Sequence, residues 1–198
     1  MTRVNIDTAI EKATQLFWMN GYGATTMRQL QHAMDMRPGS IYGAFGDKDT
    51  LYLRTLECYK KQWLLKMKTT MAGSDTAIEG LTKTISLAIF TDNSAPSDLC
   101  FLVKTVNELE TRQPDLVSYA RNALLEVRDE LQQQTELVLA ELGKSPEEIS
   151  AQAKGLAIII QAQIMGLKAQ LKLNREPEVI AALVAQFVAS IFRQTPSH

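Results

Sequence analysis

The 198-residue chain has little of several features that mark other classes of protein. Two cysteines are too few for a disulfide framework, and no stretch resembles a signal peptide, so we expect a reducing, cytoplasmic setting. Its longest apolar runs, such as Leu156 to Ile160, fall far short of the roughly 20 residues that span a bilayer. Only six prolines occur, and the apolar residues recur at helical rather than alternating spacing, so we expect an all-α fold.

Side chains that carry out catalysis are also scarce. His32 is the only internal histidine, and it falls on the polar side of a short expected helix. The chain shows no Ser-His-acid or Cys-His set, no metal-ligand spacing and no glycine-rich phosphate loop. We therefore expect no catalytic residues, no metal and no cofactor. An enzyme would need a site formed from dispersed residues.

The net charge of −1 argues against a general polyanion binder, but the charges are unevenly distributed. Residues 1–70 contain ten Lys and Arg against six Asp and Glu. Residues 71–198 contain eleven against sixteen. The first part of the chain therefore has a mild basic excess, which is weak support for nucleic-acid binding.

The most informative stretch runs from Thr25 to Leu51. Thr26 is an expected N-cap, and the apolar positions behind it recur at helical spacing, namely Met27, Leu30, Ala33 and Met34. The chain then turns, and Pro38 suits the first turn of a second helix because its missing N–H needs no partner there. Ile41 and Phe45 point to one side of this helix, and Ser40 and Tyr42 to the other. Two short helices with a tight corner describe a helix-turn-helix, which can lay its second helix in the major groove of DNA.

The segment GYGATTMRQLQHAMDMRPGSIYGAFGDKDTLY resembles the DNA-binding segment of tetracycline-repressor-type (TetR family) regulators. The shared pattern is a glycine-aromatic stop, a Thr pair, a short helix, a turn, G-S-I-Y-x-x-F, and Asp-Lys before the next helix. The resemblance covers about the first quarter of the chain. It implies that DNA is contacted by Thr26, Arg28, Arg37, Pro38, Gly39, Ser40, Tyr42 and Lys48. The chain departs from the pattern at Gly43 and Ala44, where many members carry larger side chains, and this departure leaves the operator sequence open.

Helical periodicity continues along the rest of the chain. The expected helices are about Asn5–Asn20, Lys48–Met71, Thr76–Phe90, Leu99–Leu109, Leu116–Leu142, Pro146–Leu173 and Pro177–Arg193. The start of the Lys48 helix, with the lysine beside it, is an expected phosphate site. We expect two domains, a three-helix helix-turn-helix domain at residues 1–48 and an effector-binding and dimerisation domain at residues 49–198.

The last two helices are apolar around most of their circumference, so they must be buried centrally or against another chain. A monomer core is the simpler interpretation. In the resembled family these helices pair with their copies in a four-helix dimer interface. The resemblance therefore favours a homodimer, with an interface formed by Ile160, Ile164, Leu167, Val184, Phe187 and Ile191.

The middle helices supply side chains that can line an apolar cavity for a small, mainly hydrophobic effector. The expected lining residues are Trp63, Met67, Ile85, Ile89, Phe101, Leu102, Asn107 and Leu124. The alternative is that these residues simply fill the core. Cys100 offers a further alternative, because a cysteine at a helix N-terminus can be a reactive thiol, although a free cysteine is also a common buried residue.

These observations predict a homodimeric, ligand-responsive transcription regulator, most often a repressor in this family, that binds a near-palindromic DNA operator. One alternative is the same fold with a redox or electrophile switch at Cys100. Another is a helical architectural protein that binds DNA without an effector. A small molecule that releases DNA would separate the last alternative from the first interpretation.

Overall fold

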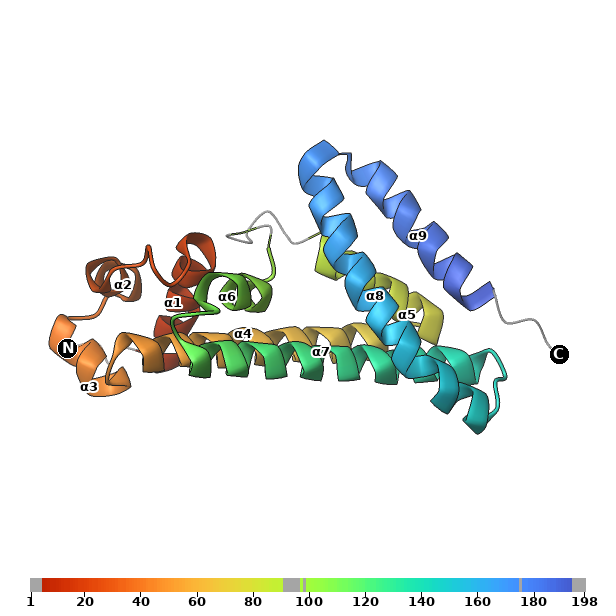
Figure 1. Ribbon diagram of the computed structural model, residues 1–198, viewed down its shortest axis with the longest axis horizontal. Helices are drawn as coiled ribbons and strands as arrows, with labels where there is room; N and C mark the ends of the chain where they lie inside the picture. Colours follow the sequence, from red (N-terminus) through yellow and green to blue (C-terminus); the bar gives the residue numbers. More distant parts are fainter. Residues whose placement is uncertain (1–4, 91–96, 98, 175, 194–198) are drawn as a thin grey trace. The chain divides into compact units, whose positions relative to one another are not determined.

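The computed structural model describes residues 5–90, 97, 99–174 and 176–193 (Figure 1). All regular secondary structure in these residues is helical, as the sequence predicts. The helices are α1 (Ile6–Asn20), α2 (Met27–Met34), α3 (Pro38–Phe45), α4 (Lys48–Ala72), α5 (Ala77–Ile89), α6 (Phe101–Leu109), α7 (Pro114–Glu141), α8 (Pro146–Asn174) and α9 (Pro177–Arg193). All except α2 and α3, for which no bounds were predicted, lie within about two residues of their predicted ranges.

Local signals explain these bounds. Thr26 and Gln29 form a capping box at the start of α2, in which each side chain accepts a backbone N–H of the other residue. Ser145 and Glu148 form the same arrangement before α8. At the other end, α1 stops at Gly21, whose φ of 85° is open to a residue without Cβ. The helix ends are therefore fixed by residues that can be read from the sequence.

The helices group into two compact units, which divide the chain differently from the predicted domains. The first unit comprises residues 1–63 and 94–125, and the second comprises residues 64–93 and 126–198. The predicted boundary between residues 48 and 49 separates segments that belong together. The first half of α4, with α6 and the start of α7, shares one hydrophobic core with α1, α2 and α3.

Aromatic side chains join the helices of the first unit. The ring of Tyr52, on α4, meets Phe17 of α1 edge-on at 4.8 Å and Phe101 of α6 at 5.4 Å between centroids. The hydroxyl of Tyr52 lies 2.8 Å from that of Thr105, so its polar end is also paired in the core. The helix-turn-helix therefore rests on a core that includes a helix about 60 residues further along the chain.

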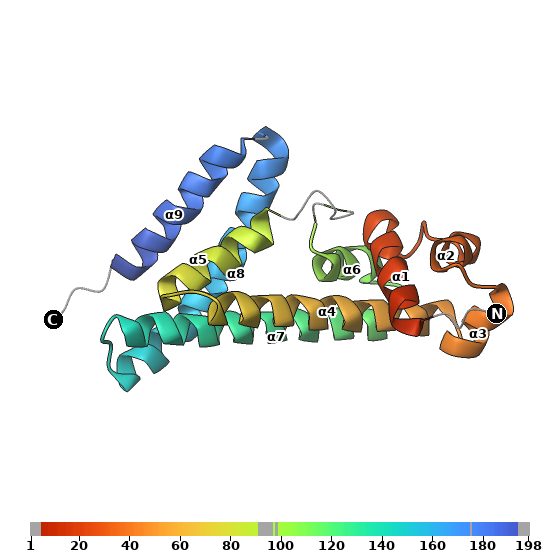
Figure 2. The same cartoon turned by 180° about the vertical axis from the view of Figure 1, so that it is seen from behind.

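In the second unit α5 contacts both α8 and α9, and α9 runs back beside α8 (Figures 1 and 2). The largest buried side chains of this unit come from five helices: Met67, Leu81, Ile85, Ile89, Leu131, Ile160, Ile180 and Phe192. None of the helices in the described residues combines the length and the apolar character that a membrane crossing requires.

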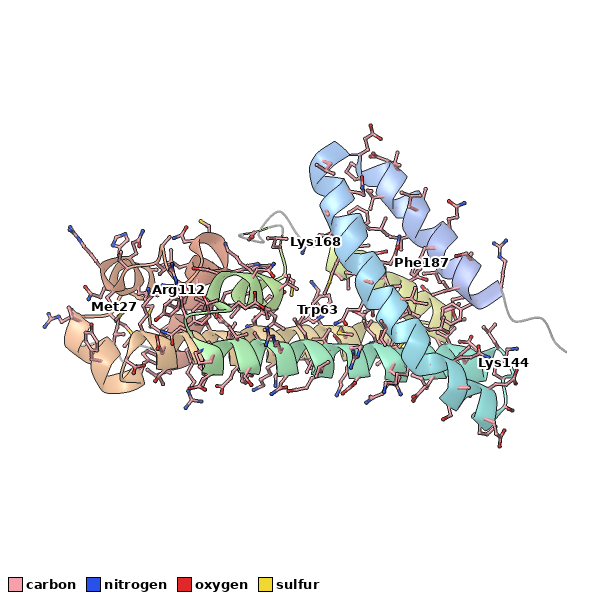
Figure 3. All side chains as sticks on the ribbon, in the orientation of Figure 1. Met27, Trp63, Arg112, Lys144, Lys168 and Phe187 are labelled. Atoms are coloured by element: carbon pink, nitrogen blue, oxygen red, sulfur yellow. The ribbon has the colours of Figure 1, made fainter. Side chains whose placement is uncertain are left out.

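The residues predicted for a dimer interface differ in their burial. Ile160, Leu167 and Val184 are buried within the subunit, so they cannot face a partner, and this part of the prediction is corrected. Ile164, Phe187 and Ile191 are half-buried, and Phe187 lies midway along α9 (Figure 3). Several exposed apolar and small residues of α8 instead form a stripe at helical spacing, namely Gly155, Ile158, Ile159, Ala162, Met165, Gly166 and Ala169.

Candidate nucleic-acid interface

Helix α3 has an inner and an outer face of opposite character. Ile41 is 1% exposed and Phe45 is also buried, so the inner face belongs to the core of the first unit. Tyr42 is 52% exposed, and the rest of the outer face is exposed as well, namely Pro38, Gly39, Ser40, Gly43 and Ala44. A Cβ added at Gly39 or Gly43 would meet nothing within 4 Å. The outer face of α3 therefore carries mostly small side chains, and Tyr42 is the one large side chain on it.

The beginnings of α2 and α3 differ in how their backbone N–H groups are used. At α2 the Thr26 hydroxyl accepts from the N–H of Gln29 and donates to the Gln29 side chain at 2.8 Å. At α3 the N-cap is Arg37, which makes no side-chain cap hydrogen bond. Free N–H groups and the helix dipole favour an anion at such an end, and the exposed Arg37 adds a positive charge.

This difference bears on the predicted contacts. The predicted contact residues Arg37, Pro38, Gly39, Ser40 and Tyr42 are all exposed, at the N-cap of α3 and along its outer face. Thr26 and Arg28 are also exposed, on the first turn of α2 (Figure 3 marks neighbouring Met27). The Thr26 hydroxyl hydrogen is already used within the capping box, however, so a phosphate would have to compete with Gln29 for it.

Lys48 is less free than its sequence position predicts. Its Nζ donates to the carbonyl oxygen of Tyr22 at 2.7 Å and lies 4.2 Å from the centre of the Tyr22 ring. Partial burial lowers the pKa of Lys48, against the opposing effect of Asp49 and Glu108. An ammonium has three N–H donors, so Lys48 keeps others for a phosphate.

The start of α4, expected as a phosphate site, is already occupied by a carboxylate. Asp47 accepts from the N–H of Thr50 at 2.7 Å, and its hydrogen bonds to Thr50 lower the pKa of Asp47. A negative side chain at this helix end repels a second anion. The Asp47 carboxylate therefore disfavours a phosphate at this end of α4, and the predicted phosphate contact depends chiefly on the Lys48 side chain.

Helix α6 holds the last turn of α1 and the α1–α2 loop through two side chains one turn apart. Lys104 Nζ donates to the carbonyl oxygens of Trp18 and Met19, at 2.9 and 2.8 Å. The Glu108 carboxylate accepts from the N–H groups of Tyr22 and Gly23, at 3.0 and 2.6 Å. The sequence alone gives Glu108 no role. No local motif marks it, because its partners lie about 85 residues away.

Tyr22 connects this loop to the start of α4. Its hydroxyl donates to the Asp49 carboxylate and accepts from Gln113 Nε2 at 3.4 Å. Burial, followed by the hydrogen bond and charge of Asp49, raises the pKa of Tyr22 to about 12. Side chains from α4 and α6, together with Gln113 just before α7, thus fix the loop that leads into the helix-turn-helix.

Residues 9–55, which span α1 to α3 and the start of α4, match the family of bacterial regulatory proteins named tetR. The match confirms that this segment resembles the DNA-binding segment of TetR family regulators. It is 28% identical over 132 residues to the HTH-type transcriptional repressor ComR of Escherichia coli K12. That match covers 65% of this chain and 60% of the relative's own length.

Two solved structures extend the similarity to the whole chain. A cysteine mutant of the TetR family regulator CifR, complexed with a 26-base-pair operator DNA, is 25% identical with a TM-score of 0.74. The alignment covers 99% of this chain and 100% of that one. A TetR family regulator of Cytophaga hutchinsonii has a TM-score of 0.76 at 17% identity, over 96% and 98% of the two chains, which shows the shared fold. The matched proteins are transcription regulators rather than enzymes.

The side chains predicted to line an effector pocket fall into both units. Phe101 and Leu102 are buried in the first unit, where Trp63 and Leu124 are half-buried and Asn107 is exposed. Met67, Ile85 and Ile89 are buried in the second unit. The buried members are part of the hydrophobic interior of their units, and their role in an effector pocket stays a prediction.

The second unit carries an open groove that the sequence did not predict. It measures about 510 Å³ and lies between the end of α4 and the outer side of α5. Its walls are Thr69, Thr70, Gly73, Ser74, Thr82, Lys83, Ser86, Leu87 and Phe90. The hydroxyls of Thr69, Ser74 and Thr82 already donate to carbonyls of their own helices, so they can only accept from a ligand.

Cys100 is the N-cap of α6, at the predicted place, and is half-buried. The Tyr59 hydroxyl donates to its sulfur at 3.6 Å. Burial, and then the neighbouring Cys100, raise the pKa of Tyr59 well above its ordinary value. The thiol thus sits beside a neutral hydroxyl donor.

Proposed function

We propose that the protein is a ligand-responsive transcription repressor that binds a near-palindromic operator as a homodimer and is released by a small, mainly hydrophobic effector. The observation that carries the DNA-binding part is the exposed face of α3. It combines an uncapped N-terminus, Arg37 beside it and small side chains that allow close approach. These features suit insertion into a major groove, with Arg37 and Ser40 placed to contact base edges.

The dimer part of the proposal rests on exposed apolar surface. The α8 stripe contains Ile158, Ile159 and Met165, with Gly and Ala between them, and α9 exposes Val179 and Leu183. Contiguous apolar patches of this kind mark protein–protein contacts, and small residues let helices approach closely. A second copy of α8 and α9 would cover both surfaces in an isologous contact. Two recognition helices could then engage half-sites about 34–36 Å apart.

Selection of bound sites from random DNA tests this proposal. We expect wild type to return a near-palindromic motif and to bind it tightly in gel shift. Arg37→Ala and Ser40→Ala should relax the preference at one or two positions of each half-site, because a good side-chain contact to a base edge contributes about 1–3 kcal/mol. Arg193→Ala, at the end of α9, is the control and should return the wild-type motif. If both α3 variants also return it unchanged, neither residue reads bases.

A second candidate for the release signal is oxidation or alkylation of Cys100. The observation that favours it is the Tyr59 hydroxyl, which donates to the sulfur and can stabilise a thiolate. Fast reaction with a thiol reagent, and oxidant-driven operator release that disappears in Cys100→Ser, would support this switch. An unreactive thiol, with release only by apolar compounds, would support the effector. Cys58→Ser is the matched control.

A further inference from the structure

The open groove at the end of α4 involves none of the predicted DNA contacts, and a tight corner defines its shape. Gly80, in the first turns of α5, packs against Met71 of α4. A Cβ at Gly80 would overlap the Met71 sulfur and lie 3.2 Å from the Met71 Cα, so the glycine allows this approach. From this corner α5 leads away from α4 at an angle (Figure 2). The groove of about 510 Å³ lies in the range of roughly 300–1,000 Å³ that is typical of small-molecule sites.

The walls of the groove offer a ligand mostly carbon. Leu87 and Phe90, at the end of α5, line the groove and are half-buried, so a ligand can cover the part of each side chain that is still exposed. Thr69 and Thr82 donate their hydroxyl hydrogens to carbonyl oxygens of their own helices, at 3.1 and 2.7 Å. Besides an acceptor oxygen, each of these threonines therefore offers a ligand only a methyl group. An apolar body suits this lining.

The side of α5 that faces the groove changes from polar to apolar along its length. Lys83, Ser86, Leu87 and Phe90 all line the groove, and their spacing of three, four and seven residues places them on one face of the helix. The cationic residue stands at one end of this strip and the aromatic ring at the other. Seven residues at 1.5 Å per residue separate them by about 10 Å. The strip therefore matches a ligand with a polar head and an apolar body of about that length.

The polar groups that remain available in the groove are hydrogen-bond donors. Lys83 is the one charged side chain among the described residues that line it. An ammonium has three N–H donors, and Lys83 donates to Glu79 at 2.6 Å, so others remain for a ligand. The hydroxyls of Ser86 on α5 and Thr70 on α4 have no hydrogen-bond partner in the part of the chain that the structure describes. The group that complements a positive charge and several donors is an anion with acceptor oxygens.

Glu79 weakens the attraction of Lys83 for an anion but does not cancel it. The Glu79 carboxylate is not part of the groove lining, and it also accepts from the N–H of Asp75 at 3.1 Å, just before α5. The hydrogen bond from Lys83, and then the one from Asp75, lower the pKa of Glu79. Its charge is thus shared between the start of the helix and Lys83, whose side chain remains 50% exposed. A ligand can therefore reach Lys83 without displacing Glu79.

We propose that this groove binds a small amphipathic carboxylate, with its carboxylate group at Lys83 and Ser86 and its apolar body along Leu87 and Phe90. This inference rests on the proposed function, because it gives the effector a chemical class and a binding site. Organic cations are repelled by Lys83. Neutral apolar compounds gain nothing from its ammonium group.

Isothermal titration calorimetry of the full-length protein with three matched probes tests this site. The probes are 4-phenylbutanoate, 4-phenylbutan-1-ol and 4-phenylbutylammonium, which share an aromatic body and differ in head group. We expect the carboxylate to bind at least tenfold more tightly than the alcohol, because a hydrogen bond to a charged group is stronger than a neutral one. The amine should bind no more tightly than the alcohol. Equal or tighter binding of the amine, or no binding of the carboxylate at millimolar concentration, overturns the proposal.

Charge variants test the head-group contact. Lys83→Met keeps the apolar stem and should lower the carboxylate affinity at least tenfold, while the alcohol affinity stays unchanged. Lys66→Met, at an exposed lysine of α4 outside the groove lining, is the control and should change neither affinity. Glu79→Gln should raise the carboxylate affinity several-fold because it removes a competing negative charge. A carboxylate affinity that is the same in Lys83→Met and wild type refutes the assignment.

A second pair of variants tests the space itself. Ser86→Phe fills the groove and should abolish binding of both the carboxylate and the alcohol. Ser86→Ala keeps the space and should lower the carboxylate affinity only a few-fold. Circular dichroism confirms that each variant is folded, and Lys83→Met, at an exposed side chain, stays decisive if Ser86→Phe does not fold. Carboxylate binding that survives in folded Ser86→Phe places the site elsewhere and refutes the proposal.

A gel shift with the selected operator separates this inference from the proposed function. Carboxylate binding that depends on Lys83, in a protein without a specific operator, would support the site and refute the repressor. Tight operator binding with no carboxylate preference would refute the site and leave the repressor intact. Groove binding that leaves the operator affinity unchanged would refute the role of the groove as the effector site.

Discussion

The two units of the molecule differ in how their polar groups are paired and in how much apolar surface they expose. The first unit pairs the polar groups of its loops internally, since Lys104, Glu108 and Tyr22 bond segments far apart in sequence. The second unit leaves apolar side chains exposed on α8 and α9, and unpaired polar atoms inside at Thr84 and Gln134. The proposed DNA contact therefore lies on a unit whose loops are internally bonded. The proposed dimer contact lies on a unit with exposed apolar surface.

The largest expected effect comes from a substitution on the exposed apolar surface of α8. Ile159→Arg places a charge in the proposed interface, where an unpaired buried charge costs several kcal/mol, so we expect a monomer whose operator affinity is at least 100-fold lower. Sedimentation and gel shift measure both. Leu65→Arg, at an exposed leucine of α4, should remain dimeric.

A substitution at Ile160, the next residue, provides a comparison for the same test. Its side chain is buried within the subunit, so Ile160→Arg should unfold the second unit rather than produce a folded monomer. Circular dichroism distinguishes the two outcomes. A monomeric wild type would contradict the proposed interface outright.

The next effect concerns Lys48, which takes part in both the loop and the proposed DNA contact. Lys48→Ala should weaken binding to every DNA sequence, and the slope of log affinity against log salt should decrease by about 0.9, the value for one lost phosphate contact. Lys48→Arg keeps the charge and serves as the control. An unchanged slope in Lys48→Ala would mean that the ammonium serves only the Tyr22 carbonyl.

Some of these features could be predicted from the sequence and others could not. The difference depends on how far apart the contacting residues lie along the chain. Helix bounds, caps and the outer face of α3 could be predicted because they depend on residues within one or two turns, such as Thr26, Pro38 and Gly21. The role of Glu108 could not, because its partners are fixed only when α6 packs on α1. Three of the six predicted interface residues, Ile160, Leu167 and Val184, lie inside the subunit for a related reason. α8 and α9 are apolar around most of their circumference, so periodicity alone does not tell which side faces inward.

A smaller effect tests how firmly α6 holds the α1–α2 loop. Glu108→Ala removes the acceptor for the N–H groups of Tyr22 and Gly23, so the free energy of unfolding should decrease by about 1–2 kcal/mol. The exposure of Gly23 keeps the cost low because water can replace one bond. Faster hydrogen exchange at both amides is the direct measurement.

Glu110→Ala is the matched control for this loop. Glu110 is also exposed, but its carboxylate contacts only the Arg121 side chain in the described structure, and an exposed pair contributes little. We expect a change within about 0.5 kcal/mol and unaltered exchange at the two amides. Equal losses in the two variants would mean that α6 does not fix the loop.

The smallest expected effect is a pH dependence of stability that arises from Tyr22 in the first unit. Burial and Asp49 raise the pKa of Tyr22 to about 12, from an ordinary value of 10.0. Below pH 10 the hydroxyl keeps its proton in both states, and its contribution to stability is complete. Between about pH 10 and 12 the unfolded chain loses this proton first, so stability decreases as the pH rises.

Tyr22→Phe should therefore lose less stability than wild type over this window. The difference should be at most about 1 kcal/mol, because the half-exposed ring is screened by solvent. Lysines titrate in the same range, so only the difference between wild type and variant is informative. Tyr42→Phe, which removes an exposed hydroxyl, should follow wild type. Parallel curves for Tyr22→Phe and wild type would show that the Tyr22–Asp49 bond does not stabilise the loop.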